Sequence, residues 1–441
     1  MNKVQLFNSR FSTFLSTPSS KSDASRLPSQ DYLIGLRGLL VIQSFLFVFF
    51  QTFLPAAVPD SQNTNGPLYQ IVLRKSLGVL FWNDSLIFSS IILLSARTLA
   101  LPYLANPNKN VCASSIFRRG IRLWIPTFIA FSLSVAAFSA GTPTYISDFL
   151  TATGNVSTSV PYRMRNFLVY FNSLYDLFWV TKWYASQAAN RAFPSGTLWI
   201  VSLLFQQSYT VYMTMVTIPH TRASWRVKAF LVFIATAWWV ESWAWYSVTG
   251  LLLADVVLNM NFQLRSRSGF MLRQTRIPIW PLYAVLISTG VLLQYLFIAW
   301  RPDMRNNELM GHTGLYNAEP LNGGVDLSQP QARDDNYLII LGCMLLVETF
   351  DWLQRILRTR VLVAMGKRSF SIFLMQPLMI YTAGIKLYMY LHAAGTNHEL
   401  ATFVCFVVCL PLTAVASEMF YRIVDVPSMA VAKEVWEWIK K

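Results

Sequence analysis

Two arginines three residues apart, Arg119 and Arg122, stand at the start of a long apolar run. Side chains at this spacing share one face of a helix, so both guanidinium groups would point the same way. A guanidinium fork matches phosphate oxygens bidentately, and the pair would suit the phosphates of acyl-CoA. The same side chains would also serve simply to anchor the end of a membrane helix. Spacing alone leaves both interpretations open.

Ionisable side chains inside other apolar runs give a second set of candidates. Arg37 lies just inside the first run, where a charge marks a site or is held by a buried ion pair or a carbonyl group. Asp84 interrupts the second run between Asn83 and Ser85. A buried carboxylate of this kind can act as a general base near neutral pH. Alternatively, Asp84 pairs with a buried arginine such as Arg37 or Arg97.

Two more acids lie in apolar surroundings, and for both a structural role is the simpler expectation. Glu241 sits in the Trp-rich stretch 238–246, which is typical of a tight hairpin at the headgroups. Asp255 lies near the end of its run, where we expect it to pair with a basic loop.

The elements that must carry these residues follow from composition. The chain has 441 residues, of which 54% are hydrophobic and only 13% charged, and its mean hydropathy is +0.40. Soluble domains carry roughly 25% charged residues. The net charge of +15 is spread over short loops and forms no single patch, so nucleic acid is not an expected partner. We predict an all-α, polytopic membrane protein.

Hydropathy places about ten transmembrane helices along the chain, each near the ~20 residues needed to cross a bilayer. The run 229–260 is too long for one helix, so we divide it at its Trp-rich middle. The expected spans are 33–57, 77–97, 123–140, 198–217, 229–243, 244–260, 279–300, 337–353, 369–392 and 400–420.

Basic residues set the expected orientation. The loops 101–122, 218–228, 261–278 and 354–368 hold 4, 3, 4 and 5 Lys or Arg and no acid. The loops on the other side hold 9 basic residues against 10 acids. By the positive-inside rule the first set and both termini are cytosolic. Asn155, in the sequon Asn155-Val156-Ser157, would then lie in an outer loop and be open to glycosylation.

Local patterns spread over most of the chain, from about residue 31 to 427, resemble the acyltransferase-3 family of integral-membrane O-acyltransferases. They occur in the family's order on a chain with about ten expected spans. The matching segments are 32–39 (YLIGLRGL), 117–126 (FRRGIRLWIP), 250–254 (GLLLA), 365–374 (MGKRSFSIFL) and 421–427 (YRIVDVP). The resemblance implies an acyl-CoA-dependent transferase, with Arg37, Arg119 and Arg122 carried over by motif match.

The sequence departs from that family in its histidines. The family is thought to use a histidine in the first span as general base, but here that position falls on Val48, with Gln51 one turn away. In the ninth span a common family histidine is replaced by Gln376. A neutral amide can orient a hydroxyl or a carbonyl but cannot accept a proton near neutral pH. The candidate catalytic residues are therefore Asp84, Gln51, Gln376 and Arg37.

Together these features predict a Ser-rich cytosolic tail (1–31), a membrane domain (32–422) and an amphipathic cytosolic tail (423–441). The expected activity is transfer of a small acyl group, acetyl in the simplest case, from acyl-CoA to a hydroxyl of a sugar, lipid or secondary metabolite. The expected partners are the bilayer, acyl-CoA and that acceptor, and no metal is expected. The alternatives are a non-catalytic scaffold or partner of another membrane protein, and a membrane cyclase or transporter of apolar metabolites.

Overall fold

The computed structural model describes residues 30–139, 143–272, 275–310, 326 and 328–440. The all-α prediction is confirmed: most of the described residues are helical, with one short antiparallel hairpin, β1 (Phe270–Leu272) with β2 (Thr275–Ile277). All but the last two residues of the predicted Ser-rich tail, 1–31, lie outside the described part of the chain.

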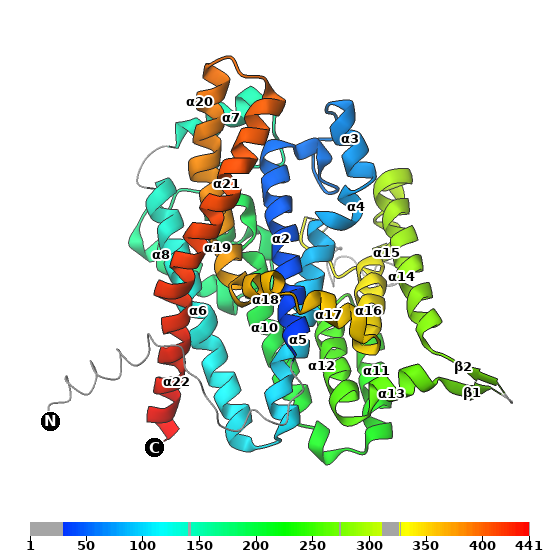
Figure 1. Cartoon of the computed structure of the whole chain (residues 1–441). Helices are drawn as coiled ribbons and strands as arrows, with labels where there is room; N and C mark the ends of the chain where they lie inside the picture. Colours follow the sequence, from blue (N-terminus) through cyan, green and yellow to red (C-terminus); the bar gives the residue numbers. More distant parts are fainter. Residues whose placement is uncertain (1–29, 140–142, 273–274, 311–325, 327, 441) are drawn as a thin grey trace, which may run out of the picture.

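The helices are numbered in chain order (Figure 1). Those of the first half are α2 (Asp31–Phe53), α3 (Leu68–Lys75), α4 (Gly78–Phe81), α5 (Asp84–Ala105), α6 (Lys109–Ser139), α7 (Thr144–Thr153), α8 (Phe167–Trp179), α9 (Ala188–Ala192) and α10 (Trp199–Met215). Those of the second half are α11 (Ala223–Trp239), α12 (Ala244–Asn259), α13 (Phe262–Ser268), α14 (Trp280–Tyr295), α15 (Asn307–Met310), α16 (Asp334–Thr349), α17 (Asp351–Leu357), α18 (Arg360–Lys367), α19 (Ser369–Met379), α20 (Ile385–Ala393), α21 (His398–Phe420) and α22 (Val426–Lys440).

Six helices among the described residues are long and apolar enough to cross a membrane, and there are up to eight if each of two bent pairs counts as one span. The chain is therefore a multi-pass membrane protein. The predicted spans 198–217 and 229–243 correspond to α10 and α11, which have 17 residues each. Helices of that length extend only about 25 Å. The count of ten spans and the cytosolic termini stay predictions.

Two predicted boundaries differ from the structure. α6 begins at Lys109, well before the expected start of its span at residue 123. At the other end of the chain, α21, a π-helical segment (Tyr421–Asp425) and α22 form one helix of 43 residues, so the amphipathic tail continues the last span. α22 packs along the first half of α6, where the rings of Phe117 and Trp436 lie 5.9 Å apart.

The centre of the fold is α5, which packs against α2, α10, α12 and α16. Glycine allows the closest of these approaches. A Cβ on Gly250 of α12 would come within 2.5 Å of the carbonyl oxygen of Leu93 in α5. α14 and α16 cross in the same manner, since a Cβ on Gly290 would meet the carbonyl oxygen of Asp335 at 2.8 Å. These contacts fix the position of α5, which carries several of the candidate site residues.

The segment 350–368, expected as a span end followed by a loop, forms two short helices. α17 bends away from α16 by 104°, and α18 follows it across the molecule beside α2 (Figure 1). In that view α17 and α18 lie about halfway down the molecule, and the predicted cytosolic loops 101–122 and 218–228 lie below them at its lower end. We refer to it as the predicted cytosolic end, and to the other as the outer end.

The segment between α6 and α10 contains α7, α8 and α9 where a long loop was expected. Within it, the Asn155 side chain is buried and donates hydrogen bonds of 2.9 Å to the backbone carbonyls of Gln51 and Thr52. A glycan cannot be attached to an amide nitrogen held in this way without unfolding the segment. The expectation that Asn155 is open to glycosylation is wrong for the folded chain.

Candidate functional site

The three motif arginines converge at one place in the predicted cytosolic half. Arg119 donates from Nε to Ser208 Oγ and from Nη2 to Ser95 Oγ, both at 3.0 Å. Arg37 donates to the hydroxyl of Thr98, one turn beyond Ser95 on α5. Arg37 lies within electrostatic range of both Arg119 and Arg122. Their positions bring together α2 and α6, which are far apart in sequence, and we call these three residues the arginine cluster.

Counter-charge near the arginine cluster comes from Asp425, at the end of the π-helical segment after α21. Arg122 lies within electrostatic range of this buried carboxylate, which accepts a hydrogen bond of 3.3 Å from Ser371 Oγ. Arg37 and Arg119 are half-buried and Arg122 is exposed. Hydroxyl groups contact the first two, and a hydroxyl does not neutralise a guanidinium. Three positive charges, of which only Arg122 interacts with the carboxylate of Asp425, favour binding of an anion.

A small cleft adjoins Arg119. It holds only about 10 Å³, the space of about one water molecule, and is lined by side chains of α5, α10 and α12, among them Ser95, Gln207, Ser208 and Ser247. Arg119 bonds to two of these hydroxyls, so the arginine cluster lies at the cleft wall. Pockets for drug-sized ligands usually measure roughly 300–1,000 Å³. The cleft is therefore too small to enclose a whole acyl-CoA.

Two of the family-like motifs pack directly on each other. Gly35 and Gly38, in the 32–39 motif of α2, face the backbone of α17 and α18, and Gly366 of the 365–374 motif faces α2. A Cβ on Gly38 would lie 2.1 Å from the carbonyl oxygen of Leu362. The glycines of both motifs thus permit a backbone-to-backbone crossing, and Arg37 lies between the two glycines of α2. This crossing fixes the segment of α2 from which Arg37 extends.

The two glutamines lie deeper along α2. Gln376 of α19 is fully buried and donates from Nε2 to Ser44 Oγ at 2.8 Å, while its Oε1 has no hydrogen-bond partner. The side-chain oxygen of Gln51 likewise has none. Arg37, Ser44 and Gln51 are seven residues apart, so they lie along one stripe of the helix. Gln51 and Gln376 therefore face the same side of α2 as the arginine cluster, at successively greater depth.

Asp84 begins α5 at the outer end, away from the arginine cluster. Its Oδ1 atom is buried without a hydrogen-bond partner. Neither expected arginine pairs with it. Arg97 donates from Nη2 to Glu348 at 3.0 Å, and Arg37 bonds to Thr98. The interpretation of Asp84 as half of a buried ion pair with either arginine is wrong. Instead, the first residue of α5 carries a carboxyl oxygen without a hydrogen-bond partner.

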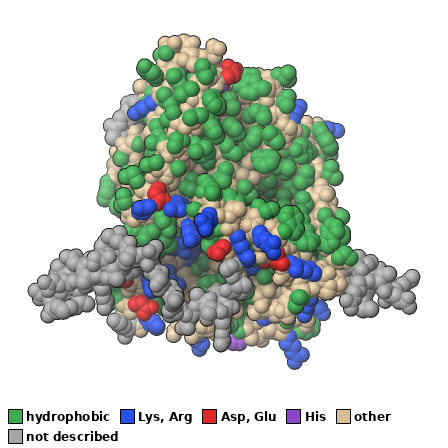
Figure 2. All heavy atoms as spheres, viewed as in Figure 1, with side chains coloured by type: hydrophobic (Ala, Val, Ile, Leu, Met, Phe, Trp, Pro, Cys, Tyr) green, Lys and Arg blue, Asp and Glu red, His purple; other side chains and the backbone are tan. Residues whose placement is uncertain are grey.

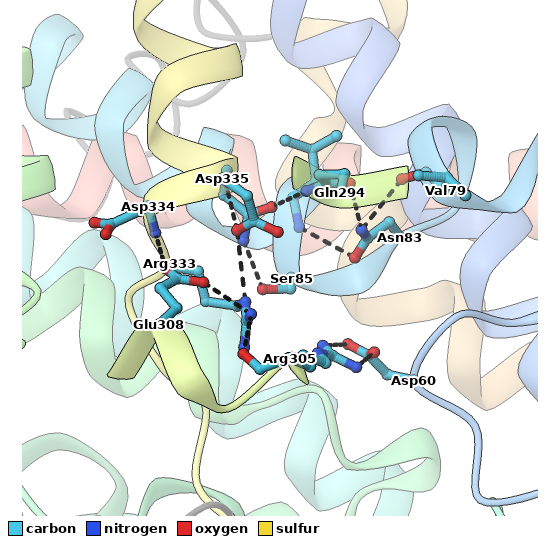
Figure 3. Close-up of polar contacts among 12 residues, drawn as sticks. Asp60, Val79, Asn83, Ser85, Gln294, Arg305, Glu308, Arg333, Asp334 and Asp335 are labelled. Carbon is cyan, nitrogen blue, oxygen red and sulfur yellow. Dashed lines mark hydrogen bonds and ion pairs between the residues drawn. The ribbon is translucent and has the colours of Figure 1, made fainter. Parts of the chain in front are cut away.

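The neighbours of Asp84 belong to a buried polar network that ties α5 to α14 and α16 (Figure 3). Asn83 donates to Gln294 Oε1 at 2.9 Å, Gln294 donates to Asn336, and Asn336 donates to Ser85 Oγ at 2.7 Å. Asn83 and Ser85, which flank Asp84 in the sequence, are thus hydrogen-bonded to side chains from two distant helices. Sequence analysis did not predict Gln294 or Asn336 as partners.

An ionic network continues from there over the outer end. Arg333 contacts Glu308 at 2.9 Å and Asp335 at 3.5 Å, and it donates to the backbone carbonyl of Arg305 (Figure 3). Arg305 in turn pairs with Asp60, just after α2. Burial and the neighbouring Asp335 raise the pKa of the Glu308 carboxyl to about 8, although Arg333 opposes the shift. Sequence analysis missed these residues because each looks like an ordinary loop charge.

The two remaining acids have structural places. Asp255 pairs with Arg226 at 3.1 Å, so the expected pairing with a basic segment is confirmed. Glu241 occupies the connection between α11 and α12 with a positive φ of 54°, as a tight turn requires. Within the described residues, no group of three or more His, Cys, Asp or Glu is arranged to hold a metal ion.

Comparison with known proteins identifies no relative. No family model, curated protein or solved structure matches this chain. The resemblance to the acyltransferase-3 family therefore rests on the sequence motifs themselves.

Proposed function

We propose that this chain is a membrane-embedded O-acyltransferase that moves a small acyl group, acetyl in the simplest case, from acyl-CoA to a hydroxyl of a sugar, lipid or secondary metabolite. The observation that carries the proposal is the convergence of Arg37, Arg119 and Arg122, with Asp425 as nearby counter-charge. A cluster of guanidinium groups at the predicted cytosolic end suits the phosphates of a cytosolic co-substrate.

In this proposal Arg119 and Arg122 hold the CoA phosphates at the protein surface, and the acyl end extends inward along α2. Ser44 follows Arg37 by seven residues, which is about 10 Å of helix. The amide of Gln376, held by Ser44, lies at that depth and can orient the acyl carbonyl. The small cleft beside Arg119 has room for about one water molecule, so the co-substrate would lie outside it.

The reaction itself joins the acceptor oxygen to the acyl carbon. The C–S bond of the thioester breaks, CoA leaves as a thiolate, and the hydroxyl proton must pass to a base. Asp84 is the candidate base, because it presents a carboxyl oxygen without a hydrogen-bond partner. It lies eleven residues from Ser95 along α5, about 16 Å. Asp84 could therefore act only on an acceptor that enters from the outer end.

A non-catalytic scaffold is the second candidate. The observation that favours it is the size of the cleft, whose volume of about 10 Å³ falls far below the usual range of ligand pockets. The absence of histidine from the expected positions points the same way. In that case the arginine cluster would bind an anion without turnover.

The deciding experiment is titration of the purified protein with CoA. Wild type should bind CoA, and the double variant Arg119→Gln, Arg122→Gln should bind at least about 100-fold more weakly, because charge-assisted bonds contribute roughly 1.5–3 kcal/mol each. Replacement of both by Lys should restore only part of the affinity, since an ammonium lacks the fork.

Arg163 and Arg165, an exposed pair in the α7–α8 segment, provide the matched control. Changing both to Gln removes the same charge and should leave CoA affinity unchanged. Wild-type protein that binds CoA but forms no acylated product with any hydroxyl acceptor would favour the scaffold. Wild-type protein without measurable CoA affinity would rule out the acyl-CoA proposal.

A further inference from the structure

The helices α17 and α18 are placed like helices that lie on a membrane surface. α17 leaves α16 at 104°, nearly perpendicular to a helix that forms part of a candidate span. α18 continues across the first turns of α2, held by the contact of Gly366 with the backbone of Ile34. The two short helices therefore lie where α2 begins and α16 ends, about halfway down the molecule, and a helix that leaves the direction of the spans at such a point can lie in the plane of the headgroups.

The exposed side chains of these helices mix basic and apolar types. Basic side chains gather over α17 and α18 at the lower edge of a broad apolar face (Figure 2). Trp352 and Ile356 are 58% and 54% exposed beside them. We define the α17–α18 surface as the six exposed residues Trp352, Arg355, Ile356, Arg358, Arg360 and Lys367. Aromatic and aliphatic groups next to arginine and lysine are typical of a surface that meets lipid headgroups.

The carboxylates around this surface are already engaged elsewhere. Asp351, at the start of α17, pairs with Arg267 at 2.8 Å. Glu418 of α21 pairs with Arg368 and, at 2.6 Å, with Arg422. These pairs neutralise the acids and leave the α17–α18 surface with a positive field.

We propose that the α17–α18 surface binds the headgroups of anionic phospholipids in the leaflet at the predicted cytosolic end. Its four basic residues follow one another along two helices that end a span, and clusters of this size next to a membrane helix attract anionic lipid. The apolar side chains of Trp352 and Ile356 would enter the acyl boundary beside them. The proposal is independent of acyl transfer.

Bound lipid would also act on the arginine cluster. Arg358 stacks over the ring of Tyr32 at 5.7 Å, and Gly38 touches the backbone of α18. Arg37 lies between these two contacts on α2. A headgroup that holds α17 and α18 against the bilayer therefore also holds the segment of α2 from which Arg37 extends.

The test is electron paramagnetic resonance of spin-labelled lipids around the full-length protein in vesicles of phosphatidylcholine and phosphatidylserine, mixed three to one. Labelled phosphatidylserine should associate with wild type about fivefold more strongly than labelled phosphatidylcholine, the factor expected for one basic side chain at an anionic surface. The triple variant Arg355→Gln, Arg360→Gln, Lys367→Gln should lose this preference. It leaves Arg358 in place because that residue supports Tyr32. Raising the salt should reduce the preference in wild type, as screening shortens the range of the field.

The control removes the same charge from the outer end through Arg163→Gln, Arg165→Gln, Lys182→Gln, all exposed positions. This variant should keep the wild-type preference. Equal loss in both triple variants would overturn the assignment, because net charge alone would then explain the effect. An unchanged preference in the α17–α18 variant, with loss in the Arg119→Gln, Arg122→Gln protein, would place the headgroup at the arginine cluster and also overturn it.

Discussion

Gly366 of α18 lies directly against the carbonyl oxygen of Ile34 in α2, where a Cβ would come within 1.8 Å of that oxygen. No side-chain rotation relieves a contact of this type, because both partners are backbone. The crossing of α2 by α18 therefore requires glycine at this position.

Gly366→Ala should destabilise the protein by about 1–3 kcal/mol or more, since overpacking at a backbone contact forces two helices apart. Thermal unfolding in detergent measures this as a lowered Tm. Gly120 is the control, because a Cβ there meets nothing within 4 Å and the residue lies inside α6. Gly120→Ala should leave the Tm unchanged or raise it, as alanine favours helix. Equal Tm for both variants would contradict the close crossing.

Asp84→Asn should stay folded and lose most of its turnover. The folded state is expected to tolerate the change because Asp84 pairs with neither Arg37 nor Arg97. The loss of rate should be roughly 10²–10⁴-fold, the usual contribution of a general base. Product formation and thermal stability are measured on one preparation. Asn83→Ala should show the reverse, lower stability with turnover kept per folded molecule, because it leaves Gln294 without a donor. A fully active Asp84→Asn protein would remove Asp84 from the mechanism.

Stability should fall as pH rises from about 4.5 to about 8, in part through Glu308. The folded state holds the pKa of this carboxyl at about 8, so in that window the native protein binds a proton that the unfolded chain has released. The free energy of unfolding then decreases by up to about 1.4 kcal/mol per pH unit and levels off above pH 8.

Glu308→Gln should flatten that slope, because glutamine imitates the protonated acid over the whole range. Chemical denaturation at several pH values gives the slope for each protein. Asp303, an exposed acid paired with Arg301, is the control, and Asp303→Asn should keep the wild-type slope. A wild-type slope that survives in Glu308→Gln would assign the effect to another group.

Single cysteines should report the orientation of the chain in intact cells. Cys343 is exposed and is first changed to serine. Lys182→Cys should react with an impermeant thiol reagent from outside, whereas Arg265→Cys should react only after permeabilisation. The expected pattern follows from the positive-inside rule. Labelling of Arg265→Cys from outside would place α13 on the outer side of the membrane. The predicted number of spans before α13 would then be wrong.

Hydropathy placed the helices well, since every predicted span overlaps a helix of the structure. Hydropathy could not predict the bend at Phe350, where α16 ends and α17 begins, because apolar content does not indicate the direction in which a helix runs. Short helices such as α18 were expected as loop because eight residues are too few to show a period. α10 and α11 were counted as spans on composition, yet neither reaches the length that crosses a bilayer untilted.

The candidate site was predictable where it depended on local spacing. Arg119 and Arg122 follow from their places on one helix, whereas their approach to Arg37 depends on how α2 packs beside α5. The hydrogen bond between Asn83 and Gln294 joins residues 211 positions apart, and no local sequence pattern predicts it. Glu308 was not predicted because its charged neighbour Arg333 lies 25 residues further along the chain, where no local pattern connects the two.

The last helix has a mechanical consequence. From His398 to Lys440 it is continuous for 43 residues, about 64 Å, roughly twice the thickness of the hydrocarbon core. A continuous helix of this length tilts as one rigid unit. A change in bilayer thickness that tilts α21 would therefore move the far end of α22 about as far as it moves the outer end of α21. The contact between the tilted rings of Trp436 and Phe117 joins that far end to α6, the helix that carries Arg119 and Arg122. Bilayer thickness would thereby bear on the position of both arginines.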